Sequence, residues 1–305
     1  MSPSLLVTGA TGKQGGATIR ALLHSDFEIL ALTRDATSAP AQKLAALSPN
    51  VKLLQGNLNN VAAIFDQARI ISRNSIWGIF SVSPINKRDP SVEEVQGRNL
   101  IDAAVFNNVQ LFVYTSVDRG GAQSATTPTN VPFWTTKHRI EQHLRIKAKS
   151  SGMRYTILRP TSFMELVSDD LTGRMFATMW KNHFDNQRMH LVAVRDIGYF
   201  AAQAFLHSDR YMGVEMTLTG DELTFAEADA VFRDKFGKPL PTANSVLVSV
   251  FLRVSKTARI IFESIKERPA DLGIEECRKI HPGLTDWKTW IGEESNFAKK
   301  LDPAM

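Results

Sequence analysis

The sequence predicts an α/β protein in which a doubly wound parallel sheet is followed by a smaller C-terminal α+β part. Short runs of Ile, Val and Leu alternate with amphipathic segments through the first half of the chain. This alternation is typical of parallel strands joined by crossover helices, and nearly unbroken aliphatic strands indicate burial on both faces. After about Thr161 the alternation is lost. We therefore expect an α/β core over residues 1–160 and a smaller C-terminal part over 161–305, some of whose strands and helices return to the core.

The predicted core contains strands and helices in alternation. Each strand is a short aliphatic run, and the runs are Ser4–Thr8, Phe27–Thr33, Val51–Gln55, Ile76–Val82, Leu111–Ser116 and Arg154–Leu158. Each helix is a segment with apolar side chains at helical spacing, and the segments are Gly15–His24, Ala41–Leu47, Val61–Ser72, Val92–Asn107 and Phe133–Lys147. The stretch Gly120–Pro132 is rich in Gly, Ser and Thr and is expected to form a flexible loop.

The C-terminal part is expected to contain a strand, Val214–Leu218, among helices. The helices are predicted at Asp196–His207, Phe225–Phe236, Asn244–Glu267 and Leu284–Lys299. Asp196 is expected to cap the first of them, because a carboxylate accepts hydrogen bonds from the free amides of a helix start. An aromatic and methionine-rich stretch after the last core strand either lines a pocket for an apolar or aromatic substrate or packs a helix onto the core. Its members are Phe163, Met164, Phe176, Met179, Trp180 and Phe184.

Composition argues against several classes of function. Of 305 residues, 43% are hydrophobic and 22% are charged, which is ordinary for a globular chain. The net charge of +5 is spread without a basic run, so neither direct nucleic-acid binding nor membrane binding is expected. Cys277 is the single cysteine and is expected to be buried or inert, and no ligand spacing indicates a metal site. No signal-like segment is found at the N-terminus, so a cytoplasmic protein is expected.

The stretch LLVTGATGKQGG, from Leu5 to Gly16, places a G-x-x-G-x-x-G pattern at the turn between the first predicted strand and helix. Glycine permits the positive φ of a tight turn and lets a pyrophosphate approach the backbone. The helix start adds free amides and a partial positive charge. The predicted phosphate contacts are Gly9, Ala10, Thr11, Gly12, Lys13, Gln14 and Gly15. The alternative is a glycine-rich turn without a ligand.

The residue after the second strand indicates which dinucleotide binds. NAD sites usually carry Asp or Glu there, bonded to the ribose 2′-hydroxyl. Here Arg34 follows the strand, and an arginine fork matches the oxygens of a 2′-phosphate and offsets their charge. NADP(H) is therefore favoured over NAD, although Asp35 could attract ribose hydroxyls and Arg34 could be a solvated loop residue.

Two further strand ends carry predicted cofactor contacts. After the third strand, Asn57 either hydrogen-bonds an adenine edge through its amide or simply makes a turn. After the fourth strand, Ser81, Val82 and Ser83 are small enough to let the backbone pass close beneath a ribose. Both positions are predictions from placement in the chain and residue type.

Together these motifs resemble the NmrA-like family of atypical short-chain dehydrogenases over most of the chain. The resembling stretches are VTGATGKQGG at Val7–Gly16, TRD at Thr33–Asp35, YTSV at Tyr114–Val117, TTKHRIEQHL around Lys137, ILRPTSFMEL at Ile157–Leu166, VRDIGYFAAQAF at Val194–Phe205 and LTDWKTWIG at Leu284–Gly292. The resemblance implies a Rossmann fold with a small substrate-side part and NADP(H) as the usual ligand. Beyond the glycine loop it implies these cofactor contacts: Arg34, Asn57, Leu58, Ser81, Val82, Ser83, Lys137, Phe163, Met164 and Leu166.

The catalytic prediction is Lys137. Short-chain dehydrogenases typically carry Tyr-x-x-x-Lys on one helix face, where the tyrosine transfers the substrate proton and the lysine holds the ribose. Here Phe133 stands four residues before Lys137, and phenylalanine cannot transfer a proton. Three interpretations stay open. Lys137 acts as the acid or base itself, as the resemblance to isoflavone and phenylcoumaran benzylic ether reductases implies; another group such as Ser116, Tyr114 or His138 donates the proton; or Lys137 only binds the ribose, without turnover.

From these features we expect an NADP(H)-dependent oxidoreductase that transfers hydride between the nicotinamide and a small apolar or aromatic metabolite. Two alternatives use the same fold. One is a non-catalytic NADP(H) sensor that regulates a protein partner, such as a transcription factor. The other is an isomerase or cyclase that works without hydride transfer.

Overall fold

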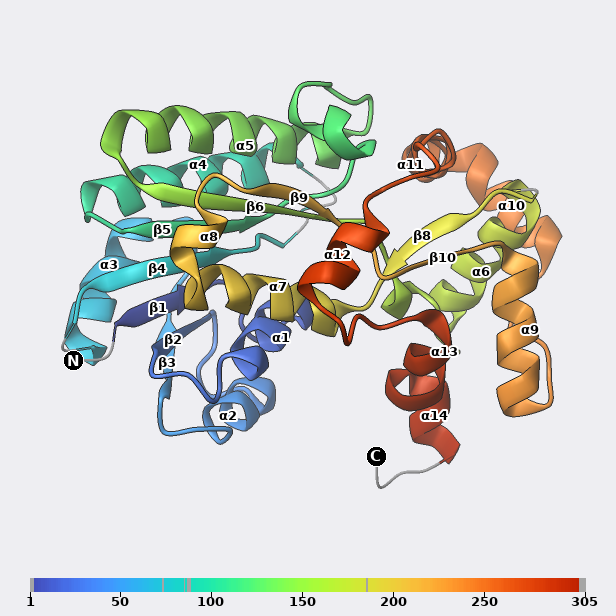
Figure 1. Ribbon diagram of the computed structural model, residues 1–305, viewed down its shortest axis with the longest axis horizontal. Helices are drawn as coiled ribbons and strands as arrows, with labels where there is room; N and C mark the ends of the chain where they lie inside the picture. Colours follow the sequence, from blue (N-terminus) through green and yellow to red (C-terminus); the bar gives the residue numbers. More distant parts are fainter. Residues whose placement is uncertain (1–2, 73, 85, 87–88, 185, 302–305) are drawn as a thin grey trace. The chain divides into compact units, whose positions relative to one another are not determined.

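The computed structural model describes residues 3–72, 74–84, 86, 89–184 and 186–301. They form two compact units, each assembled from separate stretches of the chain (Figure 1). Unit 1 comprises Met1–Val117, Pro132–Arg159 and Ile197–Met216, and unit 2 comprises Asp118–Val131, Pro160–Asp196 and Thr217–Met305. The division into residues 1–160 and 161–305 stays a prediction, and the first two and last four residues of those ranges lie outside the described residues.

A seven-stranded sheet has the order β3-β2-β1-β4-β5-β6-β9. Its strands are β1 Ser4–Val7, β2 Glu28–Thr33, β3 Val51–Gln55, β4 Ile76–Ser81, β5 Leu111–Thr115, β6 Arg154–Pro160 and β9 Glu215–Leu218. β1 pairs in parallel with β2 and β4, and parallel pairing continues to β3 on one side and to β5 and β6 on the other. The winding therefore reverses between β1 and β4, the point where doubly wound folds bind ligands. The predicted fold class is confirmed.

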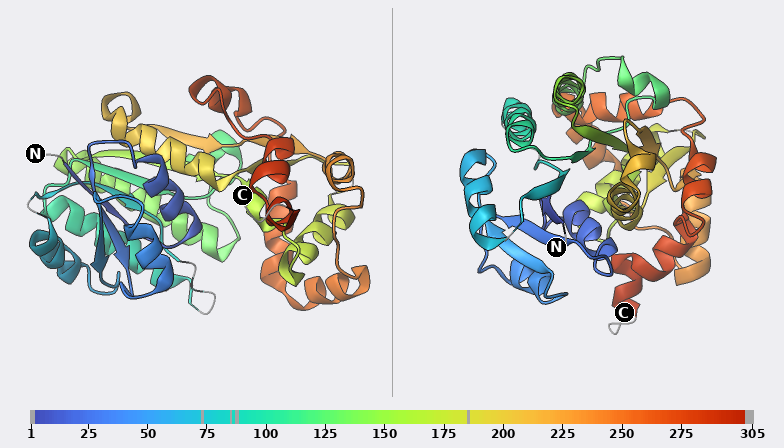
Figure 2. Two further views of the ribbon diagram at one scale, coloured as in Figure 1. Left: turned by 90° about the horizontal axis from the view of Figure 1, so that it is seen from below. Right: turned by 60° about the vertical axis from the view of Figure 1, so that its left-hand side comes forward.

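Helices cover both faces of the sheet in unit 1. They are α1 Lys13–Ala21, α2 Ala39–Ala45, α3 Val61–Ile71, α4 Ser91–Phe106, α5 Pro132–Ser151, α7 Val194–Leu206 and α8 Ser208–Tyr211. α4 and α5 run side by side along one face, while α1 and α7 lie on the other (Figures 1 and 2). One buried cluster joins Ile64 of α3, Leu100 of α4 and Ile140 of α5 to Phe112 of β5. The amphipathic pattern of these segments thus has its expected cause, which is burial of one helix face against the sheet.

Three segments differ from the sequence prediction. The single helix expected over Asn244–Glu267 is two, α10 Ser245–Val254 and α11 Lys256–Lys266, because Ser255 leaves helical geometry and its side chain accepts a hydrogen bond from Ala258 N. The helix expected near the C-terminus consists of α13 Trp287–Thr289, a π-helical turn η3 Trp290–Glu294 and α14 Asn296–Leu301, with a break at Ser295.

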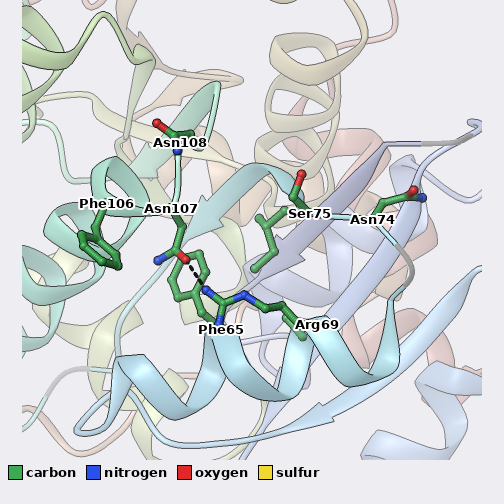
Figure 3. Close-up of a pocket in the computed structure, with 9 residues that line it drawn as sticks. Phe65, Arg69, Asn74, Ser75, Phe106, Asn107 and Asn108 are labelled. Atoms are coloured by element: carbon green, nitrogen blue, oxygen red, sulfur yellow. Dashed lines mark hydrogen bonds between the residues drawn. The ribbon is translucent and has the colours of Figure 1, made fainter.

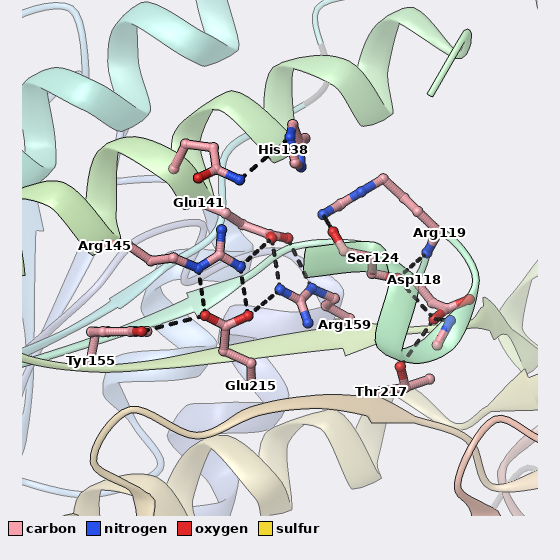
Figure 4. A network of polar contacts seen from close by, with 12 residues as sticks. Asp118, Arg119, Ser124, His138, Glu141, Arg145, Tyr155, Arg159, Glu215 and Thr217 are labelled. Carbon is pink, nitrogen blue, oxygen red and sulfur yellow. Dashed lines mark hydrogen bonds and ion pairs between the residues drawn. The ribbon is translucent and has the colours of Figure 1, made fainter. Parts of the chain in front are cut away.

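The expected loop Gly120–Pro132 contains the 3₁₀ helix η1 Gly121–Ala125. Fully buried Asp118 organises this segment of unit 2. Its carboxylate accepts a hydrogen bond from Thr217 Oγ1 at 3.0 Å (Figure 4). It also accepts one from Gly121 N at 2.8 Å and pairs with Arg268 Nε at 3.1 Å. Contacts of Asp118 with Thr217 and Arg268, both distant in sequence, therefore hold a stretch whose composition alone indicates flexibility.

Unit 2 has its own small sheet and an aromatic core. β7 Ser162–Phe163 pairs in parallel with β8 Met189–Val192, which pairs in antiparallel fashion with β10 Asp221–Leu223. The remaining elements are η2 Met164–Leu166, α6 Leu171–His183, α9 Phe225–Phe236 and α12 Ile274–Ile280. The aromatic and methionine-rich stretch lies mostly in this core: Met164, Phe176, Met179, Trp180 and Phe184 are buried in one cluster. Core packing, rather than a pocket lining, therefore accounts for these five side chains.

Two other sequence expectations concern unit 2. Asp196 does not cap α7, which begins at Val194; its carboxylate instead accepts hydrogen bonds from Thr285 N and Thr285 Oγ1, both at 2.9 Å. Cys277 is fully buried as expected, and burial raises the pKa of its thiol to about 11. Within the described part of the chain, the helices are all too short or too polar to cross a membrane.

Candidate functional site

The glycine loop joins β1 to α1 at the carboxyl edge of the sheet in unit 1. Gly9 has φ +56°, a left-handed conformation that favours glycine, and its carbonyl accepts a hydrogen bond from Gly12 N at 2.9 Å. A Cβ on Gly15 would lie 2.3 Å from Gly9 O, and one on Gly9 would lie 2.7 Å from Val82 Cγ1. Two of the predicted glycines are thus required by the backbone itself.

The start of α1 suits an anionic group. Gly12 is the residue before the helix, no side chain caps the first amides, and no acidic residue lies in the first turn. Thr11, Gly12 and Lys13 are exposed, whereas Ala10 is buried. Uncapped amides and the positive end of the helix dipole form a site for phosphate. The loop therefore fits the pyrophosphate of a dinucleotide.

Hydrogen bonds align the neighbouring strand ends with this loop. Thr8 Oγ1 donates to Val82 O at 2.8 Å and accepts from Val82 N at 2.8 Å, which joins the ends of β1 and β4. Gln14 Oε1 accepts from Thr115 Oγ1 at 2.6 Å, which joins α1 to the end of β5. Ser81 and Ser83 are buried and Val82 is half-buried. The structure thus brings the predicted residues after β1 and β4 together at one edge of the sheet, and the amide oxygen of Gln14 is used by Thr115, which was not among the predicted contacts.

Arg34 and Asp35 have opposite surroundings although they are adjacent. Arg34 is exposed and has no hydrogen bond or ion pair with any residue that the structure describes. The Asp35 carboxylate accepts hydrogen bonds from Thr37 Oγ1 at 2.6 Å and Thr37 N at 2.8 Å, and these bonds hold its pKa below the ordinary value. Asp35 is therefore engaged within its own turn, while the Arg34 guanidinium is available to a ligand such as a 2′-phosphate.

The end of β3 gives a weaker case. Asn57 is exposed, but its Oδ1 accepts a hydrogen bond from Asn59 N at 3.0 Å, as a turn asparagine does. The Leu58 side chain is buried in the core of unit 1. A nucleotide here could reach the Asn57 amide nitrogen and only the backbone of Leu58, so both contacts stay predictions.

Lys137 forms a buried ion pair that its sequence neighbourhood does not indicate. Its Nζ lies 2.6 Å from Glu93 Oε1, and the exposed fractions of the two side chains are 10% and 0%. Thr136 Oγ1 lies 3.5 Å from the other carboxylate oxygen. Glu93 is in the first turn of α4, where acidic residues are common, and no local pattern links it to a lysine 44 residues away.

Contacts to β5 locate Lys137 at the same sheet edge as the glycine loop. Its Nζ is 5.9 Å from the centroid of the Tyr114 ring. Tyr114 pairs with Ser81, the last residue of β4, and Phe80 pairs with Val7 of β1. Phe133, in the position of the usual tyrosine, is half-buried and offers only its carbonyl, which accepts a hydrogen bond from Thr136 Oγ1 at 2.9 Å. The site thus contains one ammonium group and no phenol at position 133.

The remaining predicted contacts belong to unit 2. Phe163 is half-buried in β7, Met164 is fully buried in the core, and Leu166 is 40% exposed. Met164 packs within that core, so its side chain is occupied there. The roles of these three residues as cofactor contacts stay predictions.

A network of charged side chains ties α5 to β6 and β9 (Figure 4). Arg159 of β6 donates to both oxygens of Glu141, at 3.2 Å and 2.8 Å, and also pairs with Glu215. Arg145 donates to both oxygens of Glu215, each at 2.6 Å. Burial alone raises the pKa of Glu215, but the hydrogen bonds from the two arginines outweigh it and leave the pKa below its ordinary value.

A pocket of about 320 Å³ in unit 1 is distinct from this site. It lies where α3 and α4 end and β4 begins, so in a parallel sheet it faces the edge opposite the glycine loop (Figure 3). Its arginine, Arg69, already binds Asp66 at 2.6 Å and Asn107 at 2.7 Å. The described residues that line the pocket therefore offer no unpaired charge to a nucleotide phosphate.

Comparison with known sequences shows which proteins the chain is related to. The sequence model of the NmrA-like family matches residues 1–279. An NmrA-like family domain-containing oxidoreductase, ptmS, of Penicillium ochrochloron is 31% identical over 150 residues, covering 46% of this chain and 41% of that protein. The nitrogen metabolite repression protein nmr of Neurospora crassa is 25% identical over 294 residues, covering 87% of this chain and 59% of that protein. The chain thus spans about half the length of these curated relatives.

Solved structures share the fold. Triphenylmethane reductase of Citrobacter sp., complexed with NADP(H), matches with a TM-score of 0.72 at 19% identity, covering 96% of this chain and 99% of that one. NmrA, a negative transcriptional regulator, in complex with NADP, matches with a TM-score of 0.71 at 18% identity, covering 99% of this chain and 98% of that one. At this level of identity the likeness concerns the fold alone.

Proposed function

The chain belongs to the NmrA-like family, as its motifs predict, and on that premise we propose that it binds NADP(H) in unit 1. The single observation that carries the proposal is a glycine loop at an uncapped helix start together with an exposed Arg34 at the next strand end, which has no partner among the described residues. The loop amides would hold the pyrophosphate, and the guanidinium would hold the 2′-phosphate. Asp35, bound to Thr37, leaves the ribose 2′ position to Arg34.

We further propose that the protein is an oxidoreductase acting on a small apolar or aromatic metabolite. NADPH, when bound, supplies a hydride. The chain contributes the cradle that orients the cofactor, and Lys137 contributes an ammonium group at the carboxyl edge of the sheet. Family membership supports this assignment, because several curated relatives bear the name of oxidoreductases.

One observation favours a second candidate, a cofactor sensor that regulates a protein partner. Position 133 carries no phenol, and Lys137 is bound to Glu93, so the described site lacks the usual proton donor. Related proteins include a nitrogen metabolite repression protein and a negative transcriptional regulator. A sensor would bind its partner differently in the two redox states of the cofactor and would turn over no substrate.

The test is equilibrium binding of NADPH, NADP, NADH and NAD to one preparation by calorimetry. We expect selective NADP(H) binding that weakens by about 10- to 100-fold in Arg34→Ala, since the substitution removes a charge-assisted hydrogen-bond donor. Arg69→Ala, at the opposite sheet edge, is the matched control and should bind as the wild type does. Failure of all four dinucleotides to bind would refute the proposal. NADPH consumption with carbonyl or alkene substrates would then separate the enzyme from the sensor.

A further inference from the structure

The buried carboxylate of Glu93 is paired with a single ammonium group, that of Lys137. Glu93 is fully buried, and its partners among the described residues are Lys137 Nζ at 2.6 Å and Thr136 Oγ1 at 3.5 Å. Burying an ion pair costs about as much desolvation as its attraction returns, so such a pair adds little to stability compared with apolar side chains of similar size. A role in positioning explains the pair better than a role in folding.

The contacts of Lys137 determine how many of its N–H donors stay available to a ligand. An ammonium group carries three N–H donors on a flexible stem. Glu93 accepts one of them, and in the part of the chain that the structure describes no second hydrogen-bond acceptor lies within reach of Nζ. Two donors therefore remain, on a side chain that is 10% exposed.

We propose that Glu93 is a positioning residue: it holds the Lys137 ammonium in one place so that the two remaining donors meet the hydroxyl pair of the nicotinamide-side ribose. The inference rests on the proposed binding of NADP(H). It assigns Lys137 to holding the cofactor rather than to proton transfer, and it makes Glu93 a determinant of affinity for the nicotinamide half alone. Without the carboxylate, the lysine stem would sample several rotamers and lose affinity through the entropy of reordering.

The experiment compares two probes on four proteins. NADPH carries the nicotinamide-side ribose, whereas adenosine 2′,5′-bisphosphate lacks it and reports the adenine half. In Glu93→Gln we expect the Kd for NADPH to rise about tenfold, with the Kd for adenosine 2′,5′-bisphosphate unchanged. Lys137→Met should weaken NADPH at least as much, and the double variant should be no worse than Lys137→Met, because Glu93 acts only through Lys137. Glu94→Gln is the matched control, since Glu94 is adjacent but pairs with Arg98 and Arg139.

The outcomes separate this inference from the proposed function. If the wild type binds NADPH and Glu93→Gln binds it equally well, or if the single losses add in the double variant, the positioning role is overturned while the proposed function stands. If the wild type binds neither probe, both fall. Should Glu93→Gln not fold, Glu93→Asp keeps the buried charge but is one methylene shorter. It should lose NADPH affinity while retaining affinity for adenosine 2′,5′-bisphosphate, and unchanged NADPH affinity would overturn the proposal.

Discussion

Helix α5 carries two buried ion clusters one helical turn apart, and they are built differently. At Glu141 and Glu215, two carboxylates meet two guanidinium groups through several hydrogen bonds that tie α5 to β6 and β9. At Lys137, a single carboxylate meets a single ammonium group. The difference teaches how one helix serves two purposes: multidentate arginine pairs hold the scaffold, whereas a lysine with donors to spare can serve a ligand.

The largest expected effect on stability comes from Arg159. Replacing it with Met should lower the free energy of unfolding by about 3–5 kcal/mol, because fully buried Glu141 would lose both hydrogen bonds from Arg159, at 3.2 Å and 2.8 Å. Urea denaturation measures this change. In the folded fraction, the affinity for adenosine 2′,5′-bisphosphate should be preserved. A small loss of stability would mean that the network does not hold α5 to the sheet.

Acid should weaken the same network. The pKa of Glu215 lies below its ordinary value of 4.5 in the folded protein, so its stabilising contribution is complete above about pH 4.5 and is lost as the pH falls through the folded-state pKa. Melting temperatures measured across this range should therefore fall more steeply for the wild type than for Glu215→Gln. Parallel curves for the two proteins would show that Glu215 is not linked to folding in this way.

Replacing both Glu93 and Lys137 with apolar side chains should lower the stability less than replacing Arg159 does. In Glu93→Met/Lys137→Met, two buried charges are exchanged for apolar side chains, so the free energy of unfolding should stay within about 1 kcal/mol of the wild type. NADPH affinity should nevertheless drop, as calorimetry would reveal. A large loss of stability in the double variant would show that the Glu93–Lys137 pair stabilises the fold, as the arginine cluster does.

The smallest effect is expected at the surface. Glu94→Gln removes ion pairs with Arg98 and Arg139, each at 3.1 Å, from side chains that are 47% and 61% exposed. Exposed pairs contribute about 0.5 kcal/mol, and urea denaturation should find a change of that size with unaltered NADPH affinity. A loss of stability as large as that in Arg159→Met would show that burial does not decide how much each ion pair contributes to stability.

The contrast also explains which features could be predicted from the sequence. The six core strands and the glycine loop follow from local chemistry, since aliphatic runs and glycine spacing record burial and backbone geometry directly. The breaks at Ser255 and Ser295 could not be predicted in this way. Apolar periodicity continues across both serines. Each serine side chain accepts a hydrogen bond from the first turn of the next helix, and a single serine in a sequence is only a weak sign that a helix breaks there.

The sequence by itself determined where the core strands lie along the chain, the glycine turn between β1 and α1, and the candidates Arg34 and Lys137, because each depends on neighbouring residues. Only the tertiary structure decided that Asp35 is engaged by Thr37, that the aromatic stretch of α6 is core, and that Lys137 meets Glu93. The last pairing joins residues 44 apart through the packing of α4 on α5. Long-range electrostatics depends on which surfaces come together when the chain folds, and no local pattern records that.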